Sequence, residues 1–161
     1  MDILLEDFTE MCFPDYFKLV SSVEVMAMIT ECAIPYDEAC HDFEKMLNDN
    51  ARNAELGCFR IVDANKGNFI GLAKLVQISE KPQTAELGYM LLPEFWGRGI
   101  ASRVTRLLIE KASKNLEIST LIAIIDPANA ASRKILTNHD FVSVEFRDFD
   151  GLPGEILQRA I

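Results

Sequence analysis

The sequence predicts an α+β fold, in which helices flank a mixed, twisted and mostly antiparallel sheet with one parallel strand pair. Two observations carry this prediction. Apolar residues recur at helical spacing in the first 50 residues, whereas short runs rich in β-branched residues dominate afterwards. An amphipathic stretch that begins near residue 100 lies between two such runs, and a helix of that length makes the flanking strands parallel with a right-handed connection.

Two helices are expected before residue 57, over residues 15–30 and 36–50. Pro14 and Pro35 stand where helices start, and each segment carries apolar residues on one helical face. No Pro-, Gly- or Ser-rich linker follows them, so we expect one domain over residues 1–161.

Strands are expected over residues 58–62 and 70–78, and the turn composition of residues 63–67 predicts an antiparallel hairpin between them. A third strand is expected over residues 85–92, ending at Pro93, and the crossover helix leads to a strand at 119–125. A short helix through about residue 137 follows. Strands at 141–149 and 155–160 close the chain around a turn at 151–154.

The composition excludes several classes of protein. A hydrophobic fraction of 49% suffices for a buried core, but no apolar run approaches the roughly 18 residues of a membrane span. The net charge of −9 argues against a nucleic-acid binder. The start of the chain lacks the pattern of a secretory signal, so a cytoplasmic protein is expected. Four cysteines without a CxxC pair and two histidines give too few ligands for zinc, so we expect no metal and reduced thiols, at Cys12, Cys32, Cys40 and Cys58.

The sharpest chemical signal is the segment Trp96-Gly-Arg-Gly-Ile-Ala101 at the opening of the crossover helix. Glycines let successive backbone N–H groups point inward, and the free amides of a first helical turn carry partial positive charge. This pattern favours a diphosphate cradle. A dinucleotide fingerprint would need glycine or alanine where Ser102 stands, and a P-loop would need Gly-Lys-Ser/Thr. A glycine turn that only packs the helix on the sheet remains the alternative.

The order of a strand ending at Pro93, a glycine loop, a helix, a strand and then Asn129 resembles the GNAT-type N-acetyltransferases. Gly99 and Ala101 match the acyl-CoA loop of that superfamily, and the Trp-Gly-x-Gly form resembles its ribosomal-protein and spermidine acetyltransferase branch. The resemblance implies an acyl-CoA-binding core over residues 57–141. It also implies an acidic, helical acceptor side over residues 1–56 and a C-terminal strand pair over residues 142–161.

The resemblance also implies which residues hold acetyl-CoA, the expected acyl donor. Strand backbone would pair with the pantetheine arm, loop amides would hold the pyrophosphate, and Asn129 would bond the arm or simply cap its helix. Basic side chains nearby could reach phosphate oxygens or remain solvated. The expected cofactor-binding residues are Met90, Leu91, Leu92, Gly97, Arg98, Gly99, Ile100, Ala101, Ser102 and Asn129, and the candidate basic partners are Arg98, Arg103, Arg106, Arg133 and Lys134.

The implied reaction is direct attack of a primary amine on the acetyl thioester. An amine of pKa near 10.4 is neutral in only about one molecule in a thousand near pH 7.4, a cost of roughly 4 kcal/mol. Glu86, six residues before Leu92, is the candidate catalytic base, and a glutamate exposed at a strand start is the alternative. An amide near Leu91 would polarise the thioester carbonyl.

The leaving thiolate also needs a hydrogen-bond donor. Many family members carry a tyrosine seven residues after the asparagine, but this chain has Leu136 there. Ser132 matches a serine of the ribosomal-protein branch and is the second candidate catalytic residue, with a helix-capping role as the alternative. His139 is expected at the surface. Asp140 stands where the family usually has a glycine at the helix end, and aspartate can fill that position because it tolerates the left-handed conformation.

The acidic charge is concentrated near the N-terminus. Residues 1–50 contain 12 acidic and 2 basic residues, whereas the rest of the chain is nearly neutral. Either this is a solvated helical face, or it attracts a cationic acceptor. We therefore expect a small polyamine-like amine or a peptide N-terminus as partner, no nucleic acid or membrane, and a possible homodimer. A non-catalytic acyl-CoA-binding or regulatory module and an acidic protein-interaction domain are the alternative functions.

Overall fold

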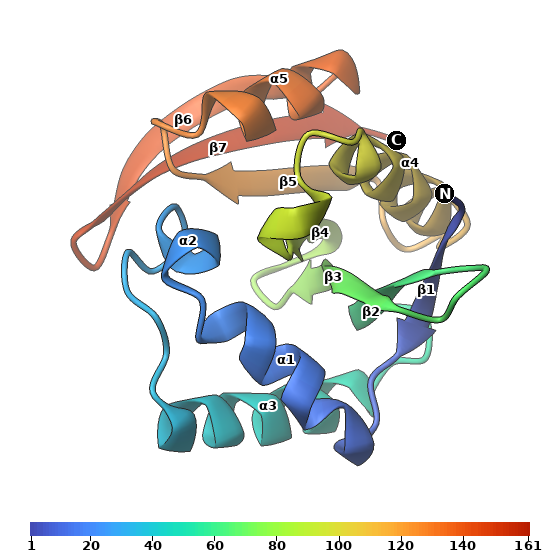
Figure 1. Cartoon of the computed structure of the whole chain (residues 1–161). Helices are drawn as coiled ribbons and strands as arrows, with labels where there is room; N and C mark the ends of the chain where they lie inside the picture. Colours follow the sequence, from blue (N-terminus) through green and yellow to red (C-terminus); the bar gives the residue numbers. More distant parts are fainter.

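Seven strands form one sheet in the order β1-β2-β3-β4-β5-β7-β6 in a computed structural model that describes all 161 residues (Figure 1). All neighbours are antiparallel except β4 and β5, which confirms the predicted sheet with one parallel pair. The elements in chain order are β1 (Ile3–Asp7), the 3₁₀ turn η1 (Glu10–Cys12), α1 (Phe13–Val20), α2 (Val23–Met26), α3 (Tyr36–Asn50), β2 (Gly57–Asp63), β3 (Phe69–Ile78), β4 (Lys81–Leu91), the 3₁₀ turn η2 (Pro93–Phe95), α4 (Ile100–Ser113), β5 (Thr120–Ile125), α5 (Ala130–Asn138), β6 (Val142–Phe149) and β7 (Leu152–Ala160).

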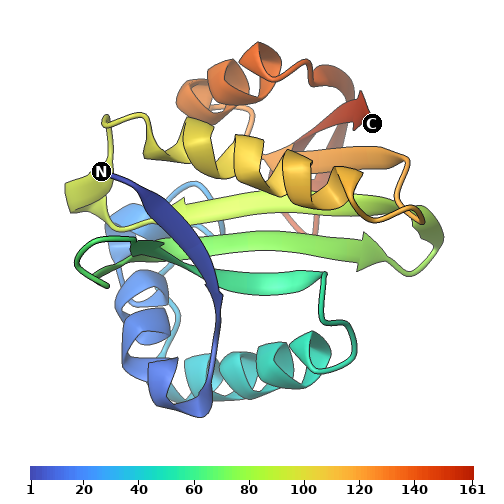
Figure 2. The ribbon, with the colours of Figure 1, turned by 90° about the vertical axis from the view of Figure 1, so that its right-hand side faces the viewer.

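Helices cover both faces of the sheet, and each face has its own apolar core. Figure 2 shows α1 and α3 on one side and α4 on the other. The larger core joins the inner residues of the central strands to α4, with Val104 and Leu108 completely buried. The smaller core joins α1, α2 and α3 to the opposite face of β3 and β4, through Leu72 and Leu92. The period-two alternation along β4 therefore sends neighbouring residues to chemically different sides.

The N-terminal region differs from the prediction in two respects. Residues 3–7 form an edge strand paired with β2, although the sequence pattern predicts only helices before residue 57. Residues 15–30 form two short helices rather than one, because Ser21 ends α1 and the hydroxyl of Ser22 accepts the N–H of Val25 as the cap of α2.

The predicted bounds of the later elements are close to the observed ones. β4 begins at Lys81 rather than at residue 85, and the β6–β7 turn is tighter than predicted, because β7 already begins at Leu152. Asp140 has a φ of 65°, so the predicted left-handed residue does end α5. None of the helices is long and apolar enough to cross a membrane.

The two C-terminal strands use their apolar residues differently. Leu157 and Ile156 of β7 are buried, and β7 lies between β5 and β6 in the sheet. β6 is the free edge, and its Val142, Val144 and Phe146 are exposed.

Candidate functional site

A cavity of about 550 Å³ opens where the parallel strand pair separates. β4 and β5 are paired only from Thr84 to Glu86, so the following residues of β4 have no strand partner on that side. The walls come from the end of β4, the loop before α4, the first turns of α5, and α2 with the turn after it. They are lined by Glu24, Val25, Met28, Ile29, Tyr89, Met90, Leu91, Phe95, Trp96, Gly97, Gly99, Ile100, Ala101, Asn129, Ala131, Ser132, Lys134 and Ile135.

The loop before α4 presents a row of free backbone donors to this cavity. Gly97 and Gly99 both have left-handed φ values, of 72° and 71°, and Gly99 is the residue before the first turn of α4. None of the six consecutive N–H groups of residues 97–102 donates to a group of the chain. Such a row at the start of a 14-residue helix fits an anion that carries several oxygens.

The end of β4 is shaped by a close approach of β3. A Cβ at Gly71 would lie only 2.0 Å from the carbonyl oxygen of Met90, so glycine is required there. The N–H of Leu92 donates to the Ile70 carbonyl at 2.9 Å, and the Trp96 indole Nε1–H donates to the Leu91 carbonyl at 2.9 Å. Trp96 therefore ties the glycine loop to the strand.

The first turn of α5 brings three polar groups together. The Oδ1 atom of Asn129 accepts the N–H of Ser132 at 3.1 Å, so Asn129 caps α5, while its NH₂ group makes no hydrogen bond within the chain. The Tyr89 hydroxyl donates to Oγ of Ser132 at 3.2 Å, from the unpaired part of β4. Leu136 is only 1% exposed and belongs to the larger core, so no polar group comes from that position.

The structure brings most of the predicted cofactor-binding residues together. Met90, Leu91, Gly97, Gly99, Ile100, Ala101 and Asn129 all line the cavity, as does Ser132. Three others do not line it. Leu92 is buried in the smaller core, Arg98 is exposed with its guanidinium over the Phe95 ring, and the Ser102 hydroxyl is 3.0 Å from Nε2 of His139.

Several basic side chains near the cavity already have partners. Arg133 contacts both carboxylate oxygens of the buried Glu155, at 2.6 to 3.2 Å, and this contact holds the pKa of Glu155 below its ordinary value. Arg103 donates to the carbonyl oxygen of Met1, and Arg106 lies 3.8 Å from Glu110. Lys134 is the only basic residue that lines the cavity, so backbone N–H groups supply most of the positive potential there.

Glu86 lies on β4 outside the lining of the cavity, on the face that it shares with Met90. Its carboxylate forms an ion pair with Lys74 on β3 at 2.9 Å, and both charges lie close to the thiol of Cys58. Burial raises the pKa of Cys58 to about 11; the negative charge of Glu86 adds to the rise, and the positive charge of Lys74 opposes it. The thiol is protonated at neutral pH and is therefore a poor nucleophile.

Three residues that bring polar groups to the cavity wall were not among the predicted site residues. Tyr89 is invisible as a polar site because the alternation of β4 assigns it to the buried face. Trp96 gives no signal of a hydrogen bond to Leu91. Glu24, the only carboxylate in the lining, lies on α2, whose start the sequence did not reveal.

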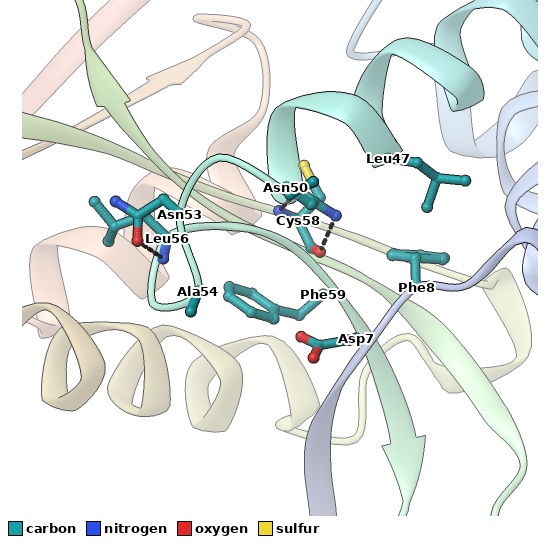
Figure 3. A pocket seen from close by; sticks show the side chains of 10 residues that line it. Asp7, Phe8, Leu47, Asn50, Asn53, Ala54, Leu56, Cys58 and Phe59 are labelled. Carbon is teal, nitrogen blue, oxygen red and sulfur yellow. Dashed lines mark hydrogen bonds between the residues drawn. The ribbon is translucent and has the colours of Figure 1, made fainter.

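A second cavity, of about 270 Å³, lies between the end of α3 and strands β1 and β2 (Figure 3). Its two asparagines are occupied by the backbone. Asn50 donates to the Cys58 carbonyl at 3.0 Å and accepts the Cys58 N–H at 2.9 Å, and Oδ1 of Asn53 accepts two further N–H groups. The carboxylate of Asp7, the NH₂ group of Asn53 and the thiol of Cys58 make no hydrogen bond within the chain. No group of three or more His, Cys, Asp or Glu side chains could hold a metal ion in this structure.

Comparison with known proteins agrees with this arrangement. The family model for the acetyltransferase (GNAT) domain matches residues 2–142. The uncharacterized N-acetyltransferase p20 of Bacillus licheniformis is 27% identical over 117 residues, which are 72% of this chain and 66% of that protein. The uncharacterized protein YkkB of Bacillus subtilis is 31% identical over 45% of this chain and 43% of its own length. This chain thus spans less than two thirds of either relative.

Solved structures share the whole fold. A GNAT-family acetyltransferase from Bacillus anthracis superposes with a TM-score of 0.81 at 15% identity, over 100% of this chain and 95% of that one. Spermidine N-acetyltransferase from Vibrio cholerae, in complex with CoA and spermine, gives 0.79 at 19% identity, over 98% and 95% of the two chains. The extent of the family match and the strand pair that opens beside a glycine loop lead to one conclusion: the chain belongs to the GNAT acetyltransferase family.

Proposed function

We propose that this chain transfers the acetyl group of acetyl-CoA to a primary amine by direct attack. The observation that carries the proposal is the row of six free N–H groups, residues 97–102, at the head of α4. It opens onto a cavity beside the half of β4 that has no strand partner on the β5 side. A diphosphate supplies the several anionic oxygens that such a row can bind.

The donor's pantetheine arm would lie along the gap between β4 and β5. An extended chain with two amides can pair there with the backbone of Met90 and Leu91, and the free NH₂ of Asn129 points from the opposite wall. The N–H groups of the strand are donors, so they are the candidates to polarise the thioester carbonyl, whereas the Leu91 carbonyl accepts the indole N–H of Trp96.

The acceptor would approach from the α2 side of the cavity. Glu24 is the only carboxylate in the lining, and Met28 and Ile29 supply apolar surface beside it. With a net charge of −10, residues 1–50 would attract an ammonium group. A small polyamine-like amine or a peptide N-terminus fits this charge, and the spermine bound by the Vibrio cholerae relative supports the first class.

Glu86 would remove the proton of the amine through a chain of water molecules. Its side chain shares a strand face with Met90, four residues along β4, so at about 3.3 Å per residue the two are about 13 Å apart along the strand. That separation excludes direct contact with the reacting amine but allows a short water chain. The Lys74 ammonium at 2.9 Å keeps the carboxylate in place.

The first experiment measures donor binding and turnover separately. Trp96 is the only tryptophan of the chain and lies in the cavity wall, so its fluorescence should change when CoA binds. Thiol release from acetyl-CoA is then followed across polyamines, aminoglycosides and basic peptides. Binding of CoA together with acceptor-dependent thiol release supports the proposal, and unchanged Trp96 fluorescence at millimolar CoA contradicts it.

The second experiment tests the base. Glu86→Gln should lower kcat and kcat/KM for the amine by about 100-fold each. Glu80→Gln, an exposed glutamate in the same β3–β4 hairpin, is the matched control and should leave both unchanged. If Glu86→Gln has no effect while Glu24→Gln does, the base is Glu24.

One observation favours a second function, a non-catalytic acyl-CoA-binding module. Position 136, for which the family resemblance implies a tyrosine, is a leucine buried in the core. Tight CoA binding without thiol release for any amine tested would select this function.

A further inference from the structure

Position 136 contributes no polar group to the cavity, but the cavity does not lack hydroxyl groups. Leu136 faces the larger core, whereas Tyr89 and Ser132 both line the cavity and are hydrogen-bonded to each other. The bond joins β4 to α5 across the gap where β4 and β5 part. It is the only hydrogen bond between side chains that spans this gap.

A count of donors shows what the pair can offer to a ligand. The Tyr89 O–H is used, because it donates to Oγ of Ser132 at 3.2 Å. The N–H of Ser132 lies at 3.1 Å from its acceptor, Oδ1 of Asn129. The O–H of Ser132 has no acceptor within the chain. A hydroxyl that accepts one hydrogen bond is also a stronger donor of another.

We propose that Tyr89 positions Ser132 so that the Ser132 hydroxyl donates a hydrogen bond to the sulfur that leaves acetyl-CoA. This role rests on the proposed function. Ser132 contacts the reacting atom, and Tyr89 acts through Ser132 as a positioning residue. Asn129 fixes the backbone of the serine, Tyr89 fixes its oxygen, and together they leave its proton directed to the cavity.

The relative acidities indicate hydrogen bonding rather than complete proton transfer. Burial raises the pKa of Tyr89 above its ordinary value of about 10, and an ordinary thiol has a pKa of about 8.5. A proton would therefore stay on the phenol in preference to the thiolate. In the balanced step the C–N bond forms, the C–S bond breaks and sulfur leaves with the electron pair. The amine loses its proton to water or Glu86, and the hydrogen-bonded thiolate takes a proton from solvent after release.

The experiment titrates the thiol of CoA bound to the protein, which needs no acceptor amine. Thiolate formation is followed by ultraviolet absorbance, with Trp96 fluorescence as the measure of binding. Ser132→Ala should lower the ionisation constant of the bound thiol about tenfold, and Tyr89→Phe about threefold, because each weakens the hydrogen bond to the thiolate. Tyr36→Phe, which removes an exposed phenol on α3, is the matched control and should have no effect.

The double variant identifies the route of the effect. If Tyr89 acts through Ser132, then Tyr89→Phe adds nothing to Ser132→Ala, and the pair is non-additive. In turnover with a reactive amine, kcat should fall about 100-fold for Ser132→Ala and about tenfold for Tyr89→Phe, with KM for acetyl-CoA unchanged. Ser132→Thr keeps the hydroxyl and should restore most of the ionisation constant.

Distinct outcomes overturn the two proposals. If CoA binds but its thiol titrates identically in wild type and Tyr89→Phe, or if the two substitutions add fully, the role of Tyr89 is wrong and the proposed function is untouched. Loss of CoA binding in Tyr89→Phe also rejects it, because the phenol then only supports the cavity. If Tyr89→Phe does not fold, 3-fluorotyrosine at position 89, a more acidic phenol of nearly the same shape, should raise the ionisation constant, and no change rejects the role. Failure of wild type to bind CoA instead rejects the proposed function.

Discussion

The two cavities of this molecule differ in what their polar groups are doing. Around the smaller cavity, both polar groups of Asn50 and the Oδ1 atom of Asn53 bond the backbone of residues 55, 56 and 58, and one amide NH₂, that of Asn53, has no partner within the chain. Around the larger cavity, six backbone N–H groups, the NH₂ of Asn129 and the O–H of Ser132 have no partner within the chain. Both lie beside the same sheet and both are mostly apolar.

The difference indicates that hydrogen-bond donors without a partner in the chain identify a ligand site better than the volume of a cavity does. Polar groups that fold the chain are satisfied within it, because an unpaired buried group costs about 1–3 kcal/mol. Groups left without partners at the mouth of a cavity must be satisfied by water or by a ligand. A substitution at the larger cavity should therefore change binding, and one at the smaller cavity should change only stability.

The largest effect is expected at the strand wall of the larger cavity. Gly71→Ala places a Cβ 2.0 Å from the Met90 carbonyl oxygen and 3.0 Å from the Cα of Leu91. Because both contacts are with backbone, the end of β4 must move, and we expect a loss of about 3 kcal/mol in the free energy of unfolding together with loss of CoA binding. Chemical denaturation and Trp96 fluorescence measure the two effects.

Gly88→Ala is the matched control for this substitution, because Gly88 lies on β4 near the same contact. Its Cβ would meet only the Lys74 side chain, at 3.8 Å, which is an ordinary contact. We expect a change below about 1 kcal/mol and unchanged CoA affinity. Equal losses in the two variants would show that the close approach at Gly71 does not shape the cavity.

A smaller and different effect is expected at the second cavity. Asn50→Ala removes both hydrogen bonds to Cys58, so the free energy of unfolding should fall by about 2 kcal/mol while CoA affinity stays the same. Asn48→Ala changes an exposed asparagine of the same helix and controls for helix propensity. A weakened CoA affinity in Asn50→Ala alone would break the distinction between the two cavities.

The sequence predicts the parts of the fold and of the site that depend on local patterns, and it does not predict the parts that depend on contacts between distant residues. Periodicity and turn residues reveal elements that are long or sharply bounded, such as α3, α4 and the β2–β3 hairpin. The strand at residues 3–7 was not predicted because an edge strand of five residues shows no clear alternation. Leu4 is exposed, and Ile3 and Leu5 are only partly buried. The break at Ser21 and Ser22 escaped because apolar spacing continues across it.

The candidate site is predictable where backbone geometry alone makes it. The two glycines, which adopt left-handed φ values, indicate the loop before α4, and Asn129 indicates the start of α5. Contacts between side chains distant in sequence are not local signals. The Tyr89–Ser132 bond joins residues 43 positions apart. The Arg133–Glu155 contact joins residues 22 positions apart, and it engages an arginine that sequence spacing alone makes a candidate phosphate ligand.

The finest test of the comparison uses two glycines with the same backbone strain. Gly99 and Gly67 both have a φ of 71°, and a Cβ at either would meet nothing within 4 Å, so alanine should cost about 1 kcal/mol of stability at each. Gly99 lines the larger cavity, whereas Gly67 lies in the β2–β3 turn.

Only Gly99→Ala should weaken CoA binding, by about tenfold, because its methyl group would occupy the space in front of the free N–H groups and its strain would reorient them. Trp96 fluorescence titrations of both variants, alongside their unfolding curves, separate the shared loss of stability from the loss of affinity. Equal affinities in the two variants would mean that the N–H row of residues 97–102 does not hold the ligand.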